Sequence, residues 1–354
     1  MSDRTHYHDL PDYPKINPSF AGVALSPDEI HFRAGPWSGP VFAMEDDDED
    51  GLLEHLLQLL DGTNPLQDIL DEFGPAASEV EQTLRSLHDR GIVVEGRDAE
   101  VPEGIPGYLA ANDRPVRDNV DHLKRTRVVV VTVGRPGEYV VEDLAAMGVG
   151  EIAIHPIDGR SLPQSLASRG NVQEGSGTPS ASSAEDADLV VYAADRPKPE
   201  LRRDINKLSH ETGTPWIAGQ VLGFDGIIGP MVVPGESSCY RCFERRSEAN
   251  MPDADAYHTV SRAVTDGTPE PLPAYGRIVA GCLSIDALNY LTGGFRITIG
   301  RIVAYDFVDL SVEANDVLRL PRCPVCGVDA GSVDVNRHLM LDQIIENVGG
   351  GDND

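Results

Sequence analysis

Two Cys-x-x-Cys pairs constrain the fold of this chain more than any other feature of its sequence. The pairs are Cys239/Cys242 and Cys323/Cys326, and they contain four of the five cysteines. Each spacing lets two thiolates bind one ion, and four thiolates complete the tetrahedral shell that Zn²⁺ prefers. We therefore predict one structural zinc, which would join two segments of one domain that lie 80 residues apart. Disulfides or a redox-active Cys-x-x-Cys site are the alternative interpretations.

The charge balance is the second constraint. Acidic residues outnumber basic ones by 58 to 29, and only four of the basic residues are lysines. Nucleic-acid binders neutralise phosphates with Lys and Arg, so this balance disfavours a nucleic-acid partner. An acid-rich, lysine-poor surface is instead expected of a protein that works in concentrated salt, and we expect a halophilic protein.

Length and hydropathy set the size and location. The 354 residues, 40% of them hydrophobic, suffice for about two domains. The sequence has no run of 18 apolar residues and no basic, apolar secretory start. We therefore expect a cytoplasmic protein without a membrane partner.

Residues 29–95 are predicted to form a small α+β domain after an N-terminal extension, residues 1–28. Two short strands, at 29–33 and 41–44, flank a turn rich in Gly and Pro. Leucines at helical spacing then predict three helices, and residues 92–94 predict a closing strand. This order is typical of a winged-helix-like unit.

Such a unit has two common uses. The third predicted helix is close to neutral, which argues against DNA binding. The other use is peptide capture, in which an extended peptide adds as a strand to an open sheet edge. For that role we predict an edge at Ile92, Val93 and Val94, with a groove lined by Leu84, Leu87 and His88. A packing module without a ligand is the alternative.

Residues 96–124, rich in Pro, Gly and charge, are predicted to be a linker to a large α/β domain at 125–330. The β-branched run at 127–133, the helix after it and the strand at 151–155 predict a parallel pair in a Rossmann-like sheet. Further strands are expected at 188–193, 215–219, 229–233, 301–306 and 316–320. Residues 159–187 are expected to be a helix with a loose loop, or partly disordered, and residues 331–354 a tail with one short helix at 336–347.

The large domain resembles the ThiF/MoeB superfamily of ubiquitin-activating-enzyme-like proteins. The resemblance rests on the segments at 188–195, 215–219, 233–242 and 322–327, the last two of which contain the cysteine pairs. In active members of that family, the first glycine turn binds ATP, an acid after the second strand binds the ribose, and the enzyme adenylates a small carrier protein. The resemblance thus implies a nucleotide site near Gly134, Gly137 and Asp158.

The chain departs from that family where the chemistry would take place. Pro136 and Glu138 stand in the turn where a phosphate site needs glycines and free N–H groups. His155 occupies the position at which the ribose acid is expected. The crossover loop, residues 249–274, has no cysteine for a thioester, and Cys282 lies in an apolar helix where a buried structural thiol is expected. We therefore expect ATP binding to be lost and the chain to lack catalytic residues of its own.

A ThiF-like domain with a degenerate ATP turn after a small winged-helix-like unit resembles the partner proteins of YcaO cyclodehydratases, which form azoline rings in ribosomally made peptides, as in bacteriocin biosynthesis. In that family the N-terminal unit binds the leader of the precursor peptide, and the separate YcaO protein performs the ATP-dependent chemistry. The resemblance implies the same role here, in a homodimer. The alternative is an ATP-dependent adenylyltransferase for a ubiquitin-like or sulfur-carrier protein.

Overall fold

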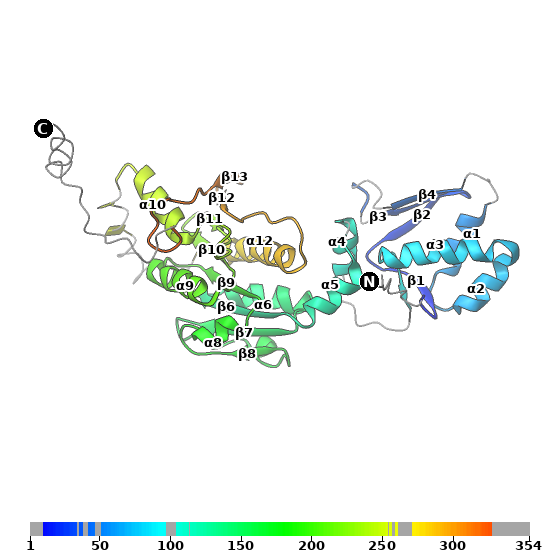
Figure 1. Ribbon diagram of the computed structural model, residues 1–354, viewed down its shortest axis with the longest axis horizontal. Helices are drawn as coiled ribbons and strands as arrows, with labels where there is room; N and C mark the ends of the chain where they lie inside the picture. Colours follow the sequence, from blue (N-terminus) through cyan, green and yellow to red (C-terminus); the bar gives the residue numbers. More distant parts are fainter. Residues whose placement is uncertain are drawn as a thin grey trace, which may run out of the picture.

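The chain forms a small N-terminal unit and a large α/β domain, with two helices between them (Figure 1). The computed structural model describes residues 10–327 except 34, 38–41, 47–50, 97–103, 113, 254, 257–258 and 261–270. No helix in this described part is long and apolar enough to cross a membrane. The predicted helix at 336–347 and half of the predicted crossover loop lie outside the described residues.

The small unit is a three-stranded antiparallel sheet packed on three helices. Alternation in β3 turns Ile30 and Phe32 into the core, where Leu84 and Leu87 of α3 meet them. The strands predicted at 29–33 and 41–44 are β3 and β4, in the sheet order β2-β3-β4, whereas the predicted closing strand, β5, lies outside this sheet, so the winged-helix-like arrangement stays a prediction. The elements are β1 (Pro14–Ile16), β2 (Ala21–Ser26), β3 (Glu29–Arg33), β4 (Phe42–Glu45), α1 (Leu52–Leu59), α2 (Leu66–Phe73), the 3-10 helix η1 (Gly74–Ala76), α3 (Ala77–Asp89) and β5 (Val93–Glu95).

The small unit begins earlier than the sequence predicted. β1 and β2 lie in the expected N-terminal extension, and β1 pairs antiparallel with β5. The buried Asn17 strengthens this closure, because its side-chain amide donates to the carbonyl of Gly91 at 2.9 Å. β1 has only three residues, one of which is a proline, so its sequence has no alternating pattern from which a strand could be predicted.

The predicted linker is also different in the structure, because it contains α4 (Ile105–Ala111) and α5 (Val116–Leu123). Leu109, Val120 and Leu123 are buried in the core of the large domain. Tyr108 adds a polar contact, since its hydroxyl donates to Asn289 Oδ1 at 2.7 Å. The two helices therefore belong to the large domain and tie the small unit to it.

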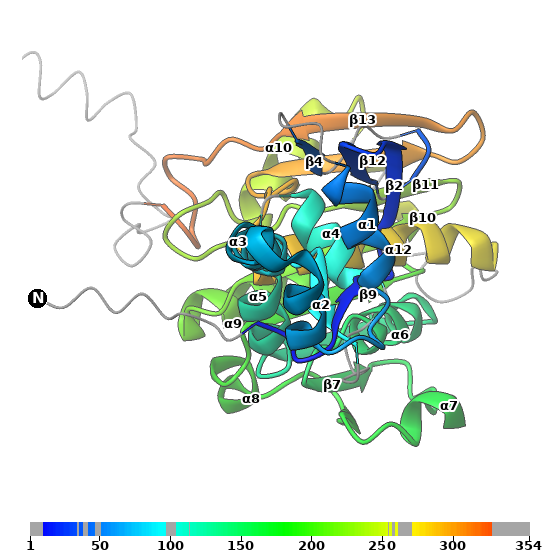
Figure 2. The ribbon, with the colours of Figure 1, turned by 90° about the vertical axis from the view of Figure 1, so that its right-hand side faces the viewer.

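The large domain is built on one eight-stranded sheet. Its order is β13-β12-β11-β10-β9-β6-β7-β8, with parallel pairing from β10 to β8 and antiparallel pairing from β10 to β13. Figure 2 shows this sheet behind the small unit, with β13 at the top and β7 near the bottom. The strands are β6 (Arg127–Val133), β7 (Glu151–Pro156), β8 (Val172–Glu174), β9 (Leu189–Ala194), β10 (Trp216–Leu222), β11 (Asp225–Ile228), β12 (Arg301–Asp306) and β13 (Ser311–Asp316).

Helices cover both faces of the parallel part, as expected of a doubly wound fold. Successive residues of β6 alternate between two cores: Val128 and Val130 face one, and Val129 and Val131 face the other. The first core packs against α6 (Pro136–Ala146), α7 (Gln164–Ala167) and α12 (Pro273–Leu291). The second packs against α8 (Ala181–Glu185), α9 (Pro199–Thr212) and α10 (Tyr240–Asn250).

Three expected segments differ in the large domain. Of the strand predicted at 229–233, only Met231 and Val232 form isolated bridges, since Pro230 has no N–H for a ladder, and β11 lies just before them. The strand predicted at 316–320 is β13, which returns directly after β12. Residues 159–187 contain α7, β8 and α8.

Candidate functional site

The four predicted cysteines come together in the structure. Cys239 caps the N-terminus of α10 and Cys242 lies in its first turn, whereas Cys323 and Cys326 follow β13. Their sulfur atoms all lie within 4.8 Å of one another. The Sγ–Sγ distances are 3.9 Å for Cys239–Cys242, 3.6 Å for Cys239–Cys323 and 3.4 Å for Cys242–Cys326.

These distances fit one tetrahedral ion. A Zn–S bond of about 2.3 Å places the corners of a tetrahedron about 3.8 Å apart, whereas a disulfide bond measures about 2.05 Å. An all-sulfur donor set suits zinc and not a hard cation such as Mg²⁺. The donor set and its spacing therefore fit the predicted zinc.

The environment of the cluster is that of a structural site. Cys239, Cys242 and Cys323 are fully buried, and the backbone N–H of Leu320 donates to Cys242 Sγ at 3.3 Å. Burial raises the pKa of the Cys326 thiol to about 11, so zinc must displace protons when it binds. With four protein ligands no position is left for a substrate. The ion would join α10 to the segment after β13.

Cys282 lies apart from this cluster. It is on α12, where the hydroxyl of Tyr305 donates to its Sγ at 3.3 Å. It is only partly buried, whereas the sequence predicted a buried thiol.

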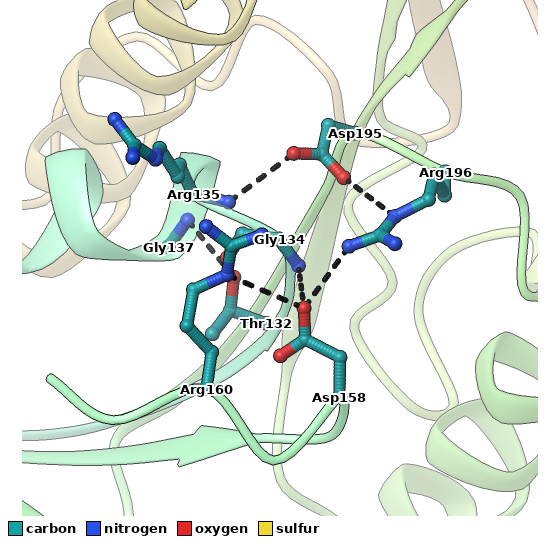
Figure 3. Close-up of polar contacts among 8 residues, drawn as sticks. All are labelled: Thr132, Gly134, Arg135, Gly137, Asp158, Arg160, Asp195 and Arg196. Carbon is teal, nitrogen blue, oxygen red and sulfur yellow. Dashed lines mark hydrogen bonds and ion pairs between the residues drawn. The ribbon is translucent and has the colours of Figure 1, made fainter. Parts of the chain in front are cut away.

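The turn that was predicted to be a degenerate nucleotide site lies between β6 and α6 (Figure 3). Gly134 has φ of 78°, which favours glycine, and its N–H donates to Asp158 Oδ2 at 3.1 Å. The N–H of Arg135 donates to Asp195 Oδ2 at 3.2 Å. Two carboxylates thus occupy the donors that a phosphate would use.

The first turn of α6 has no free donor either. Pro136 has no N–H, and the N–H of Gly137 donates to Thr132 Oγ1 at 3.0 Å. The N–H of Glu138 donates to the carbonyl of Arg135 at 2.9 Å. Burial raises the pKa of the Glu138 carboxyl, whose charge would oppose a phosphate at this helix N-terminus.

Arginines neutralise the two carboxylates. Arg196 bridges them, with Nη2 3.0 Å from Asp158 Oδ2 and Nε 3.2 Å from Asp195 Oδ1 (Figure 3). Arg160 Nε lies 3.6 Å from the same Asp158 oxygen. Sequence reasoning gave Asp195 and Arg196 no role, although their place after β9 could have indicated one, because ligands of doubly wound sheets bind at the carboxyl ends of the strands.

His155 does not reach this turn. It is buried, and its Nδ1 lies 3.0 Å from the carbonyl oxygen of Gly177. Burial lowers the pKa of its imidazole. Asp158, three residues later, is the acid that contacts the turn, in agreement with its predicted place near Gly134 and Gly137.

The residues predicted to bind a peptide lie mostly inside the small unit. Leu84, Leu87, Ile92 and Val93 are at most 1% exposed. Val94 pairs with Lys15 of β1, and His88 Nδ1 lies 3.0 Å from the carbonyl oxygen of Val93. These side chains support the sheet and helix from within, and β1 covers one edge of the strand that was expected to be open.

A different strand of the small unit has an open edge. β4 pairs with β3 alone, and within the described residues no strand lies on its other side. The N–H of Asp46 donates to the carbonyl of Asp28, so by antiparallel alternation Ala43 and Glu45 direct their backbone groups outward. The C-terminal end of α3 is adjacent, because the Arg90 guanidinium lies 4.5 Å from the Phe42 ring centre.

Comparison with known proteins identifies the large domain. The model of the ThiF family matches residues 164–325. The large domain is a ThiF-family domain. The chain is 29% identical to the SAMP-activating enzyme E1 of Haloferax volcanii over 60% of this chain and 83% of that protein. It is 25% identical to the molybdopterin-synthase adenylyltransferase of Escherichia coli over 59% of this chain and 90% of that protein. The predicted resemblance to this superfamily is confirmed.

Solved structures share the fold of both units. The heterocyclase TruD aligns with a TM-score of 0.64 and 18% identity, over 90% of this chain and 43% of TruD. MccB of E. coli, solved with ATP, aligns with a TM-score of 0.59 and 16% identity, over 89% of this chain and 99% of MccB. The large domain alone cannot account for such coverage, so the likeness includes the small unit. This chain spans about two fifths of the length of the heterocyclases that it matches.

Proposed function

We propose that this chain is a non-catalytic partner protein. It binds the leader of a ribosomally made precursor peptide and presents it to a separate YcaO-type cyclodehydratase. The observation that carries the proposal is the open edge of β4 beside α3. An extended peptide that adds to this edge gains backbone hydrogen bonds from Ala43 and Glu45.

The glycine turn supports a role without nucleotide chemistry. Its backbone donors are bonded to Asp158, Asp195 and Thr132, and Pro136 supplies none. A phosphate would have to displace two carboxylates that three hydrogen bonds and ion pairs from Arg196 and Arg160 hold in place. The zinc, by contrast, serves the fold.

The likeness to heterocyclases supports the choice of partner. This chain aligns with about two fifths of TruD, and we assign peptide binding to the aligned part and ring formation to another protein. The sequence of the peptide and the type of ring depend on the precursor and on its cyclodehydratase. The homodimer stays a prediction.

The second candidate is an adenylyltransferase. It is favoured by the names of the sequence relatives and by Asp158, an acid at the end of β7 that contacts the glycine turn. Pyrophosphate exchange with ATP and a carrier protein discriminates the two candidates, because only the adenylyltransferase catalyses it.

The proposed role is tested by fluorescence anisotropy in high salt. The probe is a fluorescein-labelled leader from a short open reading frame rich in Cys, Ser or Thr, to be sought beside this chain's gene. Ala43→Pro removes one outward N–H and leaves the β3–β4 ladder intact, so peptide affinity should fall at least about fivefold, in keeping with one lost hydrogen bond plus the clash of the ring. Ala43→Val keeps the N–H and should bind as the wild type does. If the wild type binds no leader, or Ala43→Pro binds it equally well, the role or its location is wrong.

A further inference from the structure

A cavity opens at the junction of the small unit with α4 and α5. Its volume is about 210 Å³, which leaves room for a side chain. Phe42, the first residue of β4, is one of its lining residues, so the cavity lies at that end of the open edge of β4. The lining residues are Phe42, Asp89, Arg90, Ile92, Ala110, Arg114 and Pro115.

The two arginines of this cavity bring positive charge, and no described carboxylate forms an ion pair with either of them. Arg90 lies over the ring of Phe42, and within the described part of the chain it forms no ion pair. Arg114 donates to Thr292 Oγ1 and, at 3.0 Å, to Asn289 Oδ1, both of which are neutral. Asp89 also lines the cavity, yet no ion pair joins it to either arginine among these residues.

Arg85 of α3 offers a contrast, because its guanidinium lies 2.9 Å from the carboxylate of Glu81. Arg90 and Arg114 come from different elements and meet at one cavity whose remaining wall, Phe42 and Ile92, is apolar. A guanidinium pair beside an apolar wall suits a carboxylate on a short aliphatic stem.

We propose that this cavity binds an Asp or Glu side chain of the leader peptide between Arg90 and Arg114. The inference rests on the proposed peptide-binding role and specifies the peptide: a strand-forming segment for the edge of β4, with an acidic residue where it passes the Phe42 end. Because Arg114 is bonded to Asn289 and Thr292 at the end of α12, the acidic side chain contacts the large domain as well as the small unit.

The test starts from a probe that assumes no leader sequence. A random dodecapeptide library displayed on mRNA is selected on the immobilised full chain in high salt. We expect enriched peptides to share a strand-forming segment with Asp or Glu at one end. Enriched peptides that lose binding on Ala43→Pro but share no acidic position would overturn the carboxylate site and leave the proposed function standing. A library with no enrichment would overturn both.

Charge-removing variants then locate the contact. For the selected consensus peptide, Arg90→Gln and Arg114→Gln should each raise Kd about tenfold or more, as expected for a charge-assisted hydrogen bond. Arg85→Gln, which removes the same charge from the same helix outside the cavity, should change Kd less than twofold. Replacing the peptide's acidic residue with its amide should raise the Kd of the wild type by a similar factor. The same change in the peptide should raise the Kd of the Arg90→Gln variant much less. Equal losses in both proteins would contradict the assignment, as would unchanged binding by both arginine variants, whose folding is verified by their unfolding midpoints.

Discussion

The zinc cluster allows the most quantitative prediction. In Cys323→Ser, the ion would lose one of four thiolates, and we expect the metal to dissociate, which removes the connection between α10 and the segment after β13. The two connected cysteines, Cys239 and Cys323, lie 84 residues apart. Treated as a cross-link that closes a loop of this length, the connection removes about 4.5 kcal/mol of chain entropy from the unfolded state.

That energy is a large part of the stability of an ordinary domain, which is about 5–15 kcal/mol. For a domain of this size, each 1 kcal/mol shifts the unfolding midpoint by about 2–4 °C, so we expect Cys323→Ser to melt roughly 10–18 °C below the wild type. Chelation of the wild type should lower its midpoint by a similar amount.

The assay pairs thermal unfolding by circular dichroism in high salt with zinc content by mass spectrometry. Cys282→Ser is the matched control, because Cys282 lies outside the cluster and serine can still accept from Tyr305. It should keep one zinc per chain and a midpoint close to that of the wild type. The reasoning fails if Cys323→Ser retains stoichiometric zinc, or if it loses the metal and still melts within about 2 °C of the wild type.

Three further predictions concern the large domain. ATP with Mg²⁺ should show no saturable binding in calorimetry at millimolar concentration, since the donors of the glycine turn are occupied; a saturable isotherm would contradict this. Gly134→Ala should lower the free energy of unfolding in urea by about 1–3 kcal/mol, because Gly134 has a positive φ and a Cβ there would lie 2.0 Å from Asp195 Oδ2. Gly281→Ala is the control and should not destabilise the domain, because its Cβ would meet no atom within 4 Å. Burial lowers the pKa of His155, so the unfolded state binds a proton more readily than the folded state, and the free energy of unfolding should fall as the pH drops below about 6.5. His155→Asn should remove only part of this pH dependence, because burial also lowers the pKa of His210. An unchanged pH dependence in the variant would refute the assignment.

Sequence patterns predicted the large domain well because its signals are local and strong. The β-branched run of β6 and the apolar run of β9 were placed almost to the residue, and the parallel pairing of β6 with β7 is confirmed. The two Cys-x-x-Cys pairs also predicted that the four cysteines lie together, because four thiolates complete one tetrahedral shell.

The small unit and the sites were harder to predict because their determinants are non-local. Which strand edge stays open depends on β1, a three-residue segment that pairs with β5 from 79 residues away in the sequence and covers the edge that had been expected to bind. The bonding of Asp195 to the glycine turn joins residues 60 positions apart. Proline and charge at 96–124 suggested a linker, whereas the apolar residues at i, i+3 and i+4 spacing in α4 and α5 were too few to stand out.

Because α4 and α5 pack into the large domain, a peptide that binds to the small unit would be held beside that domain. With a flexible tether, the downstream part of a substrate would sample many distances from a partner enzyme. Ala110 and Val116 of these helices also contact the small unit, so under the proposed function each residue beyond the leader would advance at most about 3.3–3.6 Å from one place beside the large domain. The number of residues between the leader and the modified side chain would then determine which positions reach the partner enzyme. Shortening this spacer would first stop modification of the positions nearest to the leader.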